Sequence, residues 1–134
     1  MNFPTKVLIV DDEAHVRAFL GRLAQADLGG PALFEAPDAA TALELFQRER
    51  PDLVLLDTNL IGTSGLDVLE QIRALDEDVV IIMLSTTSVM SAIQEAIDRG
   101  ANGFVLKNVG SEKVASSLLE AVTESFGTDS DDAA

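Results

Sequence analysis

Five short apolar runs recur along the chain, and they constrain its fold more strongly than any other feature. Each run is rich in Leu, Ile and Val or carries an aromatic residue, which is typical of a strand buried on both faces of a sheet. The runs cover residues 6–10, 32–35, 53–56, 79–84 and 104–106. The segments between them repeat apolar residues at helical spacing, as at Val16, Leu20 and Leu23, and predict five amphipathic helices.

The alternation of strands and helices predicts a doubly wound α/β domain, in which helices cover both faces of one five-stranded parallel sheet. We expect the strand order 2-1-3-4-5, which makes strands one and three neighbours. The 134 residues suffice for one domain of ordinary size. We assign this domain to residues 1–126. Residues 127–134 lack apolar anchors, and we expect a disordered acidic tail or the start of a linker there.

Composition excludes several classes of function. The chain has no Cys, which rules out disulfides, thiolate metal sites and cysteine nucleophiles, and its one His, His15, cannot form a histidine metal cluster. With 9 basic and 23 acidic residues the net charge is −14, which repels phosphate backbones and anionic lipid. We therefore expect no direct nucleic-acid binding through this domain and no membrane binding.

The sequence predicts neither a membrane span nor a signal peptide. The longest apolar run, at residues 79–84, is far shorter than the roughly 20 residues of a membrane-spanning helix. The N-terminal apolar stretch is followed at once by Asp11, Asp12 and Glu13, so it is not the core of a signal peptide. We therefore expect a cytoplasmic protein.

Polar side chains follow four of the five apolar runs. Asp11 and Asp12 follow the first run, Asp57 the third, Ser85 the fourth and Lys107 the fifth. Open parallel sheets bind ligands at the carboxyl ends of their strands, so we expect these residues to share one rim, with the three carboxylates close together. Taken singly, each has an ordinary explanation, because an Asp or Ser in such a place can cap the next helix.

Three clustered carboxylates need compensating positive charge, which Lys107 and a hard cation would supply. Oxygen ligands without His or Cys favour Mg²⁺ or a similar ion. The chemistry that this set predicts is phosphoryl transfer, in which an Asp carboxylate attacks phosphorus and forms an acyl phosphate. The cation and Lys107 would neutralise the phosphoryl oxygens, and Ser85 would hydrogen-bond one of them.

At these positions the sequence resembles the receiver family of bacterial and archaeal response regulators, over about residues 4–125. The matching segments are VLIVDDE at residues 7–13, LVLLD at 53–57 with Gly65 eight residues after Asp57, IIMLS at 81–85 and GFVLK at 103–107. The resemblance implies a flavodoxin-like or CheY-like fold and a role in two-component (phosphorelay) signal transduction. It does not imply an enzyme with a separate substrate, because a receiver catalyses only its own phosphorylation and dephosphorylation.

The resemblance also implies the roles of the residues at the site. Asp57 would accept the phosphoryl group from a histidine kinase or a phosphotransfer protein, with Lys107 and Ser85 assisting. Asp12, Asp57 and the backbone carbonyl of Asn59 would coordinate Mg²⁺, while Asp11 would act through a bound water. No cofactor beyond the metal is implied.

Further residues are implied in switching and in phosphate lifetime. Ser85 and Phe104 occupy the family's switch positions, and Asn59 and Thr87 flank the path of the hydrolytic water. We expect an output protein, whose identity the sequence does not give, on the face of the fourth helix, fifth strand and fifth helix, at residues 88–99, 103–107 and 111–126. Because Phe104 lacks the hydroxyl of a Tyr, contact there should be apolar and based on shape.

Three residues depart from the family's frequent pattern. Asn108 follows Lys107 where Pro is common, Ile61 replaces another frequent Pro, and Thr86 replaces a small Ala beside Ser85. We expect these changes to alter the loop after Lys107 and the access of the phosphodonor.

Alternatives remain at the level of the whole protein. A receiver can act alone or form part of a larger DNA-binding transcriptional regulator, and the Lys107-Asn108 pair keeps the second arrangement open. A haloacid dehalogenase-type phosphatase is a remote alternative, because Asn59 stands where that family needs a carboxylic acid. The glycines at 62 and 65 match neither the dinucleotide-binding nor the P-loop pattern.

Overall fold

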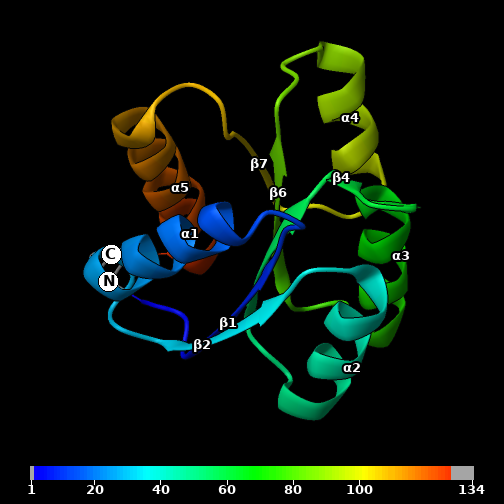
Figure 1. Ribbon diagram of the computed structural model, residues 1–134, viewed down its shortest axis with the longest axis horizontal. Helices are drawn as coiled ribbons and strands as arrows, with labels where there is room; N and C mark the ends of the chain where they lie inside the picture. The colour runs from blue at the N-terminus through cyan, green and yellow to red at the C-terminus, as the bar shows by residue number, and fades with distance from the viewer. Residues whose placement is uncertain (1, 128–134) are drawn as a thin grey trace.

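The computed structural model describes residues 2–127, and its centre is a sheet of five parallel strands. Their order is β2-β1-β3-β6-β7, which is 2-1-3-4-5 when only these five strands are counted, so the predicted order is confirmed. Figure 1 shows the sheet between two layers of helices. The strands are β1 (Lys6–Val10), β2 (Ala32–Ala36), β3 (Leu53–Asp57), β6 (Val80–Ser85) and β7 (Gly103–Leu106).

Five helices cover the sheet, as the spacing of apolar residues predicts. Helices α1 and α5 pack on one face and α2, α3 and α4 on the other (Figure 1). The predicted doubly wound α/β fold is therefore confirmed. The helices are α1 (Ala14–Asp27), α2 (Ala39–Glu49), α3 (Gly65–Leu75), α4 (Met90–Asp98) and α5 (Ser111–Phe126).

The central strands are apolar at every position because both of their faces are buried. In β1, Val7 and Ile9 contact the core beneath α1 and α5, whereas Leu8 and Val10 contact the core beneath the other three helices. All four side chains are fully buried. Burying an aliphatic side chain of this size stabilises a fold by about 1.5–3 kcal/mol. Two cores thus hold the strands rigidly and fix the ends from which the site is built.

Three strands, β2, β3 and β6, end one residue later than the apolar runs predict, and two of them end in a polar residue. Asp57 is the last residue of β3 and Ser85 the last of β6, and they are only 3% and 1% exposed. The capping alternative for Ser85 is wrong, because α4 begins after Val89. It is wrong for the acidic pair as well, since the N-cap of α1 is Glu13 and no side chain caps that helix.

A short hairpin follows β3 that the sequence pattern did not predict. Strands β4 (Asn59–Leu60) and β5 (Thr63–Ser64) pair antiparallel, directly after Asp57. Two-residue strands are too short to carry a periodic pattern.

The expectation of an acidic tail or linker at the C-terminal end is not tested, because residues 128–134 lie outside the described residues. Within residues 2–127, no helix combines the length and apolar character needed to cross a membrane.

Candidate phosphoacceptor and metal site

Three carboxylates meet at the carboxyl end of the sheet. Strands β1 and β3 pair in parallel with Val10 opposite Leu56, so the residues that follow them lie side by side. One carboxylate oxygen from each of Asp11, Asp12 and Asp57 lies within 4.8 Å of the others. The structure thus brings together the three acidic residues that the sequence placed on one rim.

Asp57 is a buried carboxylate with two protein partners. Its Oδ1 accepts a hydrogen bond from the Asn59 N–H at 3.1 Å, and its Oδ2 lies 3.1 Å from Lys107 Nζ. Burial raises the pKa of Asp57, and the like charge of Asp11 adds to that, outweighing the opposing effect of Asn59 and Lys107. The charged form of Asp57 is therefore short of compensating positive charge.

Lys107 faces two carboxylates at once. Its Nζ donates to Asp11 Oδ2 at 2.8 Å, and the same atom is the partner of Asp57. Burial lowers the pKa of Lys107, but its hydrogen bonds to these carboxylates and their attraction outweigh burial, so the pKa is raised overall. The two raised pKa values thus have different causes: burial and the charge of Asp11 raise that of Asp57, whereas its two carboxylate partners raise that of Lys107. One ammonium therefore faces a cluster of three carboxylates, which leaves the cluster with excess negative charge.

Asp11 and Asp12 are adjacent in sequence but differ in their surroundings. Asp11 is fully buried, and its two carboxylate oxygens accept from the Glu13 N–H at 2.9 Å and from Lys107. Asp12 is half-buried, and within residues 2–127 no donor bonds its carboxylate. Both Asp12 oxygens are therefore available to a ligand.

A cleft of about 260 Å³ opens above these groups and is lined by Asp12, Glu13, Asp57, Asn59, Thr86 and Lys107. The atoms that this cleft offers to a metal ion are hard oxygen atoms, the ligand type that Mg²⁺ selects. Lys107 balances the negative charge of the carboxylates only in part. The residues present therefore fit a hard divalent cation. Thr86 is exposed at this cleft, where it can affect the access of a phosphodonor.

Ser85 and Phe104 lie around a second, smaller cavity. Ser85 Oγ accepts from the Thr87 N–H at 3.1 Å, so the Ser85 hydroxyl proton is free for another acceptor. Phe104 is half-buried and packs against the core beneath α2, α3 and α4. The cavity, of about 180 Å³, is lined by Thr58, Asn59, Ser64, Leu66, Ser85, Thr87, Ala92 and Phe104. The residues expected at the switch positions, Ser85 and Phe104, thus share one cavity with Asn59 and Thr87.

Gly65 is close to the backbone that carries Asp57. Its N–H donates to the Thr58 carbonyl at 2.8 Å. A Cβ at this position would overlap the Asp57 carbonyl oxygen and lie 2.8 Å from Thr58 Cα. Only glycine allows the start of α3 to approach the end of β3 this closely.

Sequence reasoning missed two residues at the site. Arg17, on α1, donates from Nη1 to the Asp11 carbonyl at 2.7 Å. The Thr58 hydroxyl is buried at the edge of the second cavity, with no hydrogen-bond partner among the described residues. Arg17 lies within a helix, and Thr58 follows the strand end at Asp57 but belongs to no recognisable motif, so no signal in the sequence singled them out.

The departures from the family's frequent pattern are accommodated in loops. The peptide between Lys107 and Asn108 is trans, and both Asn108 and the following Val109 are exposed. Ile61 stands at the turn of the β4–β5 hairpin with 81% of its surface exposed. None of the three substitutions displaces a carboxylate or Lys107 from the cluster.

Comparison with known proteins identifies the family. The family model described as response regulator receiver domain matches residues 7–119. This chain belongs to the response regulator receiver family. Phosphoryl acceptance in two-component signalling is the known function of receiver domains, and these domains interact with histidine kinases or phosphotransfer proteins. The match agrees with the resemblance seen in the sequence and favours a receiver domain over the remote alternative of a phosphatase.

Relatives of this receiver domain differ in length. It is 38% identical over 119 residues to the nitrate/nitrite response regulator protein NarP of Escherichia coli, covering 89% of this chain but 54% of that protein. It is 31% identical over 121 residues to the chemotaxis protein CheY of Bacillus subtilis, covering 90% of this chain and 97% of that protein. The chain thus spans about half of the first relative and nearly all of the second.

A solved structure shares the fold over almost the whole chain. The two-component response regulator of the LuxR family from Aurantimonas sp. SI85-9A1 superposes with a TM-score of 0.81 at 25% sequence identity. The match covers 98% of this chain and 94% of that one.

Proposed function

We propose that this receiver domain accepts a phosphoryl group on Asp57, from a histidine kinase or a phosphotransfer protein, in a Mg²⁺-dependent reaction. One observation carries the proposal: Asp57 is a buried carboxylate at the end of β3 that faces an open cleft beside Lys107 and Asp12. The domain would act as a catalyst only on its own carboxylate, forming and later losing the acyl phosphate.

Asp12, Asp57 and the Asn59 carbonyl would hold the Mg²⁺ ion, and Asp11 would act through a bound water. The supporting observation is the contrast between the carboxylates: among residues 2–127 no donor bonds that of Asp12, whereas each oxygen of Asp11 accepts a hydrogen bond, from Glu13 or Lys107. When bound, the ion supplies positive charge to the carboxylates and to the phosphoryl oxygens.

In the transfer step, an Asp57 carboxylate oxygen attacks phosphorus and forms the new O–P bond. The bond between phosphorus and the donor atom breaks, and the donor leaves with that electron pair. Lys107 lies 3.1 Å from Asp57 Oδ2 and would neutralise charge on the transferred group. Ser85 would donate its free hydroxyl proton to a phosphoryl oxygen, because its acceptor side is already used by Thr87.

Loss of the phosphoryl group would be controlled by Asn59 and Thr87. Both line the cavity beside Asp57, and Asn59 also lines the cleft, so both are near the approach of a hydrolytic water. Asn59 can orient that water but cannot ionise to act as its base. We therefore propose that the acyl phosphate decays without a general base, over minutes.

The phosphoacceptor is tested with a small donor. Acetyl phosphate and Mg²⁺ should add one phosphoryl group to the intact protein, as measured by mass spectrometry, and a chelator should prevent the addition. Asp57→Asn should take up none, while Asp67→Asn, on the exposed surface of α3, should behave as wild type. Uptake by Asp57→Asn at the wild-type rate would show that the acceptor lies elsewhere.

The output would come from the face of α4, β7 and α5. Two residues at the start of α4, Val89 and Met90, are 58% and 73% exposed, which suits an apolar contact with another protein. Whether that protein is separate or part of the same chain is a second question. The similarity to NarP, of which this chain spans 54%, is compatible with the alternative that residues 1–126 form the receiver portion of a larger regulator, and the similarity to CheY, of which it spans 97%, with a receiver that acts alone.

A further inference from the structure

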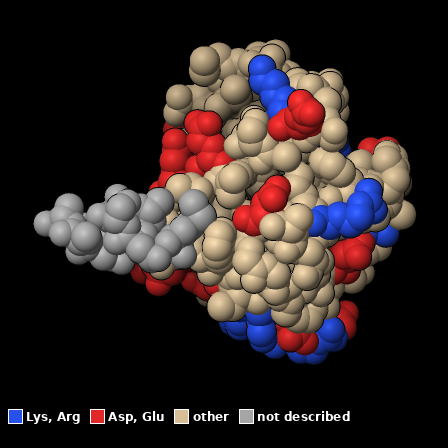
Figure 2. Space-filling model, turned by 90° about the vertical axis from the view of Figure 1, so that its left-hand side faces the viewer, with Lys and Arg blue, Asp and Glu red and all other residues tan. Residues whose placement is uncertain are grey.

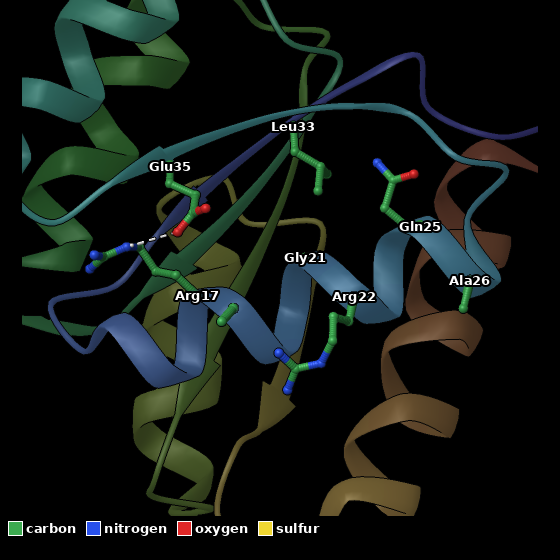
Figure 3. Close-up of a pocket in the computed structure, with 8 residues that line it drawn as sticks. Arg17, Gly21, Arg22, Gln25, Ala26, Leu33 and Glu35 are labelled. Carbon is green, nitrogen blue, oxygen red and sulfur yellow. Dashed lines mark hydrogen bonds and ion pairs between the residues drawn. The ribbon is translucent and has the colours of Figure 1, made fainter.

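Arg17 of α1 connects three segments of the structure beside the candidate metal site. Its Nη1 donates to the Asp11 carbonyl at 2.7 Å, and its Nε donates to Glu35 Oε1 of β2 at 3.1 Å. Figure 3 shows Arg17 reaching toward Glu35, with the dashed line marking this ion pair. The Arg17 side chain is 16% exposed and that of Glu35 52%, so the bond to the Asp11 carbonyl is partly shielded from water whereas the ion pair with Glu35 is partly exposed.

The bond to the Asp11 carbonyl completes the immobilisation of that residue. The Asp11 N–H donates to the Ala36 carbonyl at 3.1 Å, and its carboxylate is held by Glu13 and Lys107. The carbonyl is the one remaining polar group of Asp11, and Arg17 binds it. Because the peptide unit is planar, a fixed Asp11 carbonyl also fixes the amide plane from which Asp12 extends.

Asp12 depends on this backbone restraint more than its neighbours do. Its carboxylate receives no hydrogen bond from any residue between 2 and 127, whereas Asp11 and Asp57 are each held by side-chain contacts. A ligand carboxylate that no side chain orients can be positioned only through its own backbone. Arg17 donates a hydrogen bond to the carbonyl of the peptide group between Asp11 and Asp12.

We propose that Arg17 is a positioning residue for the metal site: through the Asp11 carbonyl it fixes Asp12 relative to Asp57. The proposal rests on the function proposed above, in which Asp12 binds Mg²⁺. Glu35 contributes by holding the guanidinium in place and by offsetting its charge, so the arginine adds order to the loop with little repulsion toward a cation. Lysine could not replace it, because a single ammonium lacks the planar fork that reaches both partners.

A purely structural role makes a different prediction. An exposed or partly exposed ion pair contributes about 0–1 kcal/mol to stability, and its loss would not alter metal affinity. Positioning of Asp12 predicts the reverse, with metal affinity altered much more than global stability. Outer-shell partners of metal ligands change metal affinity by about 10–100-fold when mutated.

The test compares Arg17→Lys with Arg22→Lys. Both arginines lie on α1 and line an open groove of about 590 Å³ between α1 and β2. Figure 3 shows Arg22 directed away from Glu35, so its substitution is a matched control. Both changes preserve net charge, which removes long-range electrostatics from the comparison. Titration with MgCl₂, followed by NMR shifts of backbone amides, should give about tenfold weaker binding in Arg17→Lys and unchanged binding in Arg22→Lys. Equal affinity in wild type and Arg17→Lys would overturn the proposal.

A metal-free measurement separates this proposal from the proposed function. Amide hydrogen exchange at Asp11 and Glu13, whose N–H groups are hydrogen-bonded in the loop, should accelerate in Arg17→Lys while exchange in the central strands stays unchanged. Glu35→Gln should give the same effect more weakly, because Arg17 remains but loses its anchor. If wild type binds no Mg²⁺, the proposed function fails on its own. Unchanged exchange in Arg17→Lys would still contradict the positioning role.

Discussion

Adjacent residues with identical side chains have different environments at this site. Asp11 is buried and fully hydrogen-bonded, whereas Asp12 is half-buried and offers both oxygens to the cleft. The difference follows from the end of β1: the Asp11 N–H still bonds β2 at the Ala36 carbonyl, and the chain then turns into α1. Their surroundings thus suit the separate roles proposed above, with Asp12 as a ligand of the ion and Asp11 acting through a bound water.

Substitution Asp12→Ala should abolish Mg²⁺-dependent uptake of the phosphoryl group from acetyl phosphate. It should also raise the melting temperature of the metal-free protein, because one of three mutually repelling carboxylates is removed. Intact mass spectrometry and thermal unfolding in a chelator measure the two effects. Asp67→Ala, on the exposed surface of α3, is the control and should retain uptake. Mg²⁺-dependent uptake at the wild-type level in Asp12→Ala would exclude Asp12 as a metal ligand.

Residues of the cluster could be predicted from the sequence because strand ends of a parallel sheet converge. Asp11, Asp12, Asp57 and Lys107 each follow an apolar run, and the structure places them within one network of contacts. Arg17 could not be predicted in this way. Its contacts depend on how α1 packs beside β2, which is a tertiary property with no local pattern.

At the scale of elements, α2 has the clearest helix cap of the structure. Asp38 accepts a hydrogen bond from the Thr41 N–H at 2.8 Å, and this bond lowers the pKa of Asp38 below its ordinary value of 3.8. A lowered pKa in the folded state means that the carboxylate contributes stability above pH 3.8. That contribution is lost as the pH falls through the lower, folded-state value.

Asp38→Ala should therefore lower the melting temperature at neutral pH, because α2 loses its cap. The difference from wild type should shrink as the pH falls below 3.8, where Asp38 becomes protonated in both states. Thermal unfolding over a pH series measures this. Glu77→Ala, in the exposed loop after α3, serves as the control for removal of an acidic side chain. A pH-independent difference would show that the charged carboxylate is not what stabilises the helix.

Helix α4 is held firmly at only one end. At its C-terminal end, Arg99 pairs with Glu70 and Glu95, and the Gly100 carbonyl accepts two bonds from Arg73 at 3.1 and 2.7 Å. Its N-terminal end has no side-chain cap, and among its nine residues only Ala96 is buried. The loosely held end follows the segment that carries Ser85 and Thr87.

Addition of beryllofluoride and Mg²⁺, a stable mimic of the acyl phosphate, should therefore move the start of α4 more than its end. Ser85 should shift toward the mimic, and Phe104 should turn further into the cavity that both residues line. Amide and aromatic NMR shifts record these changes, with Asp57→Asn as the control that should show none. Shifts confined to the metal loops, with Phe104 and α4 unchanged, would rule out this switch.

The elements themselves were predictable to different degrees. The five sheet strands could be predicted because each contains an apolar run, and the five helices because each is long enough to repeat apolar residues at helical spacing. The β4–β5 hairpin was not, although it carries Asn59, because its two-residue strands are defined only by contact with each other. Strand ends were placed one residue early at Asp57 and Ser85, because polar side chains interrupt the apolar pattern while the backbone pairing continues.

For the molecule as a whole, charge is the dominant bulk property. The net charge of the chain is −14, and on the face shown in Figure 2 acidic side chains gather in a broad patch at the upper left, while basic side chains lie in separate groups. Repulsion among like charges opposes the compact state. Salt screens such repulsion with a Debye length of about 10 Å at 0.1 M.

The melting temperature should therefore rise with NaCl concentration, most steeply below about 0.1 M where screening is weakest. Measurements in a chelator exclude site-specific binding of divalent ions, and a KCl series tests whether the effect depends on ionic strength alone. A melting temperature that falls or stays constant in the same range would show that favourable ion pairs, such as those of Arg99, outweigh the general repulsion.

The close approach of Gly65 to the end of β3 has a genetic consequence. Every missense change at this codon adds a Cβ where the Asp57 carbonyl oxygen and Thr58 already lie, so each one must displace the backbone that presents the phosphoacceptor. The two cores are built from other residues and would persist. A selection for loss of signalling that demands normal protein abundance should therefore be enriched in alleles of codon 65. The proteins that such alleles encode would be expressed and folded but unable to signal.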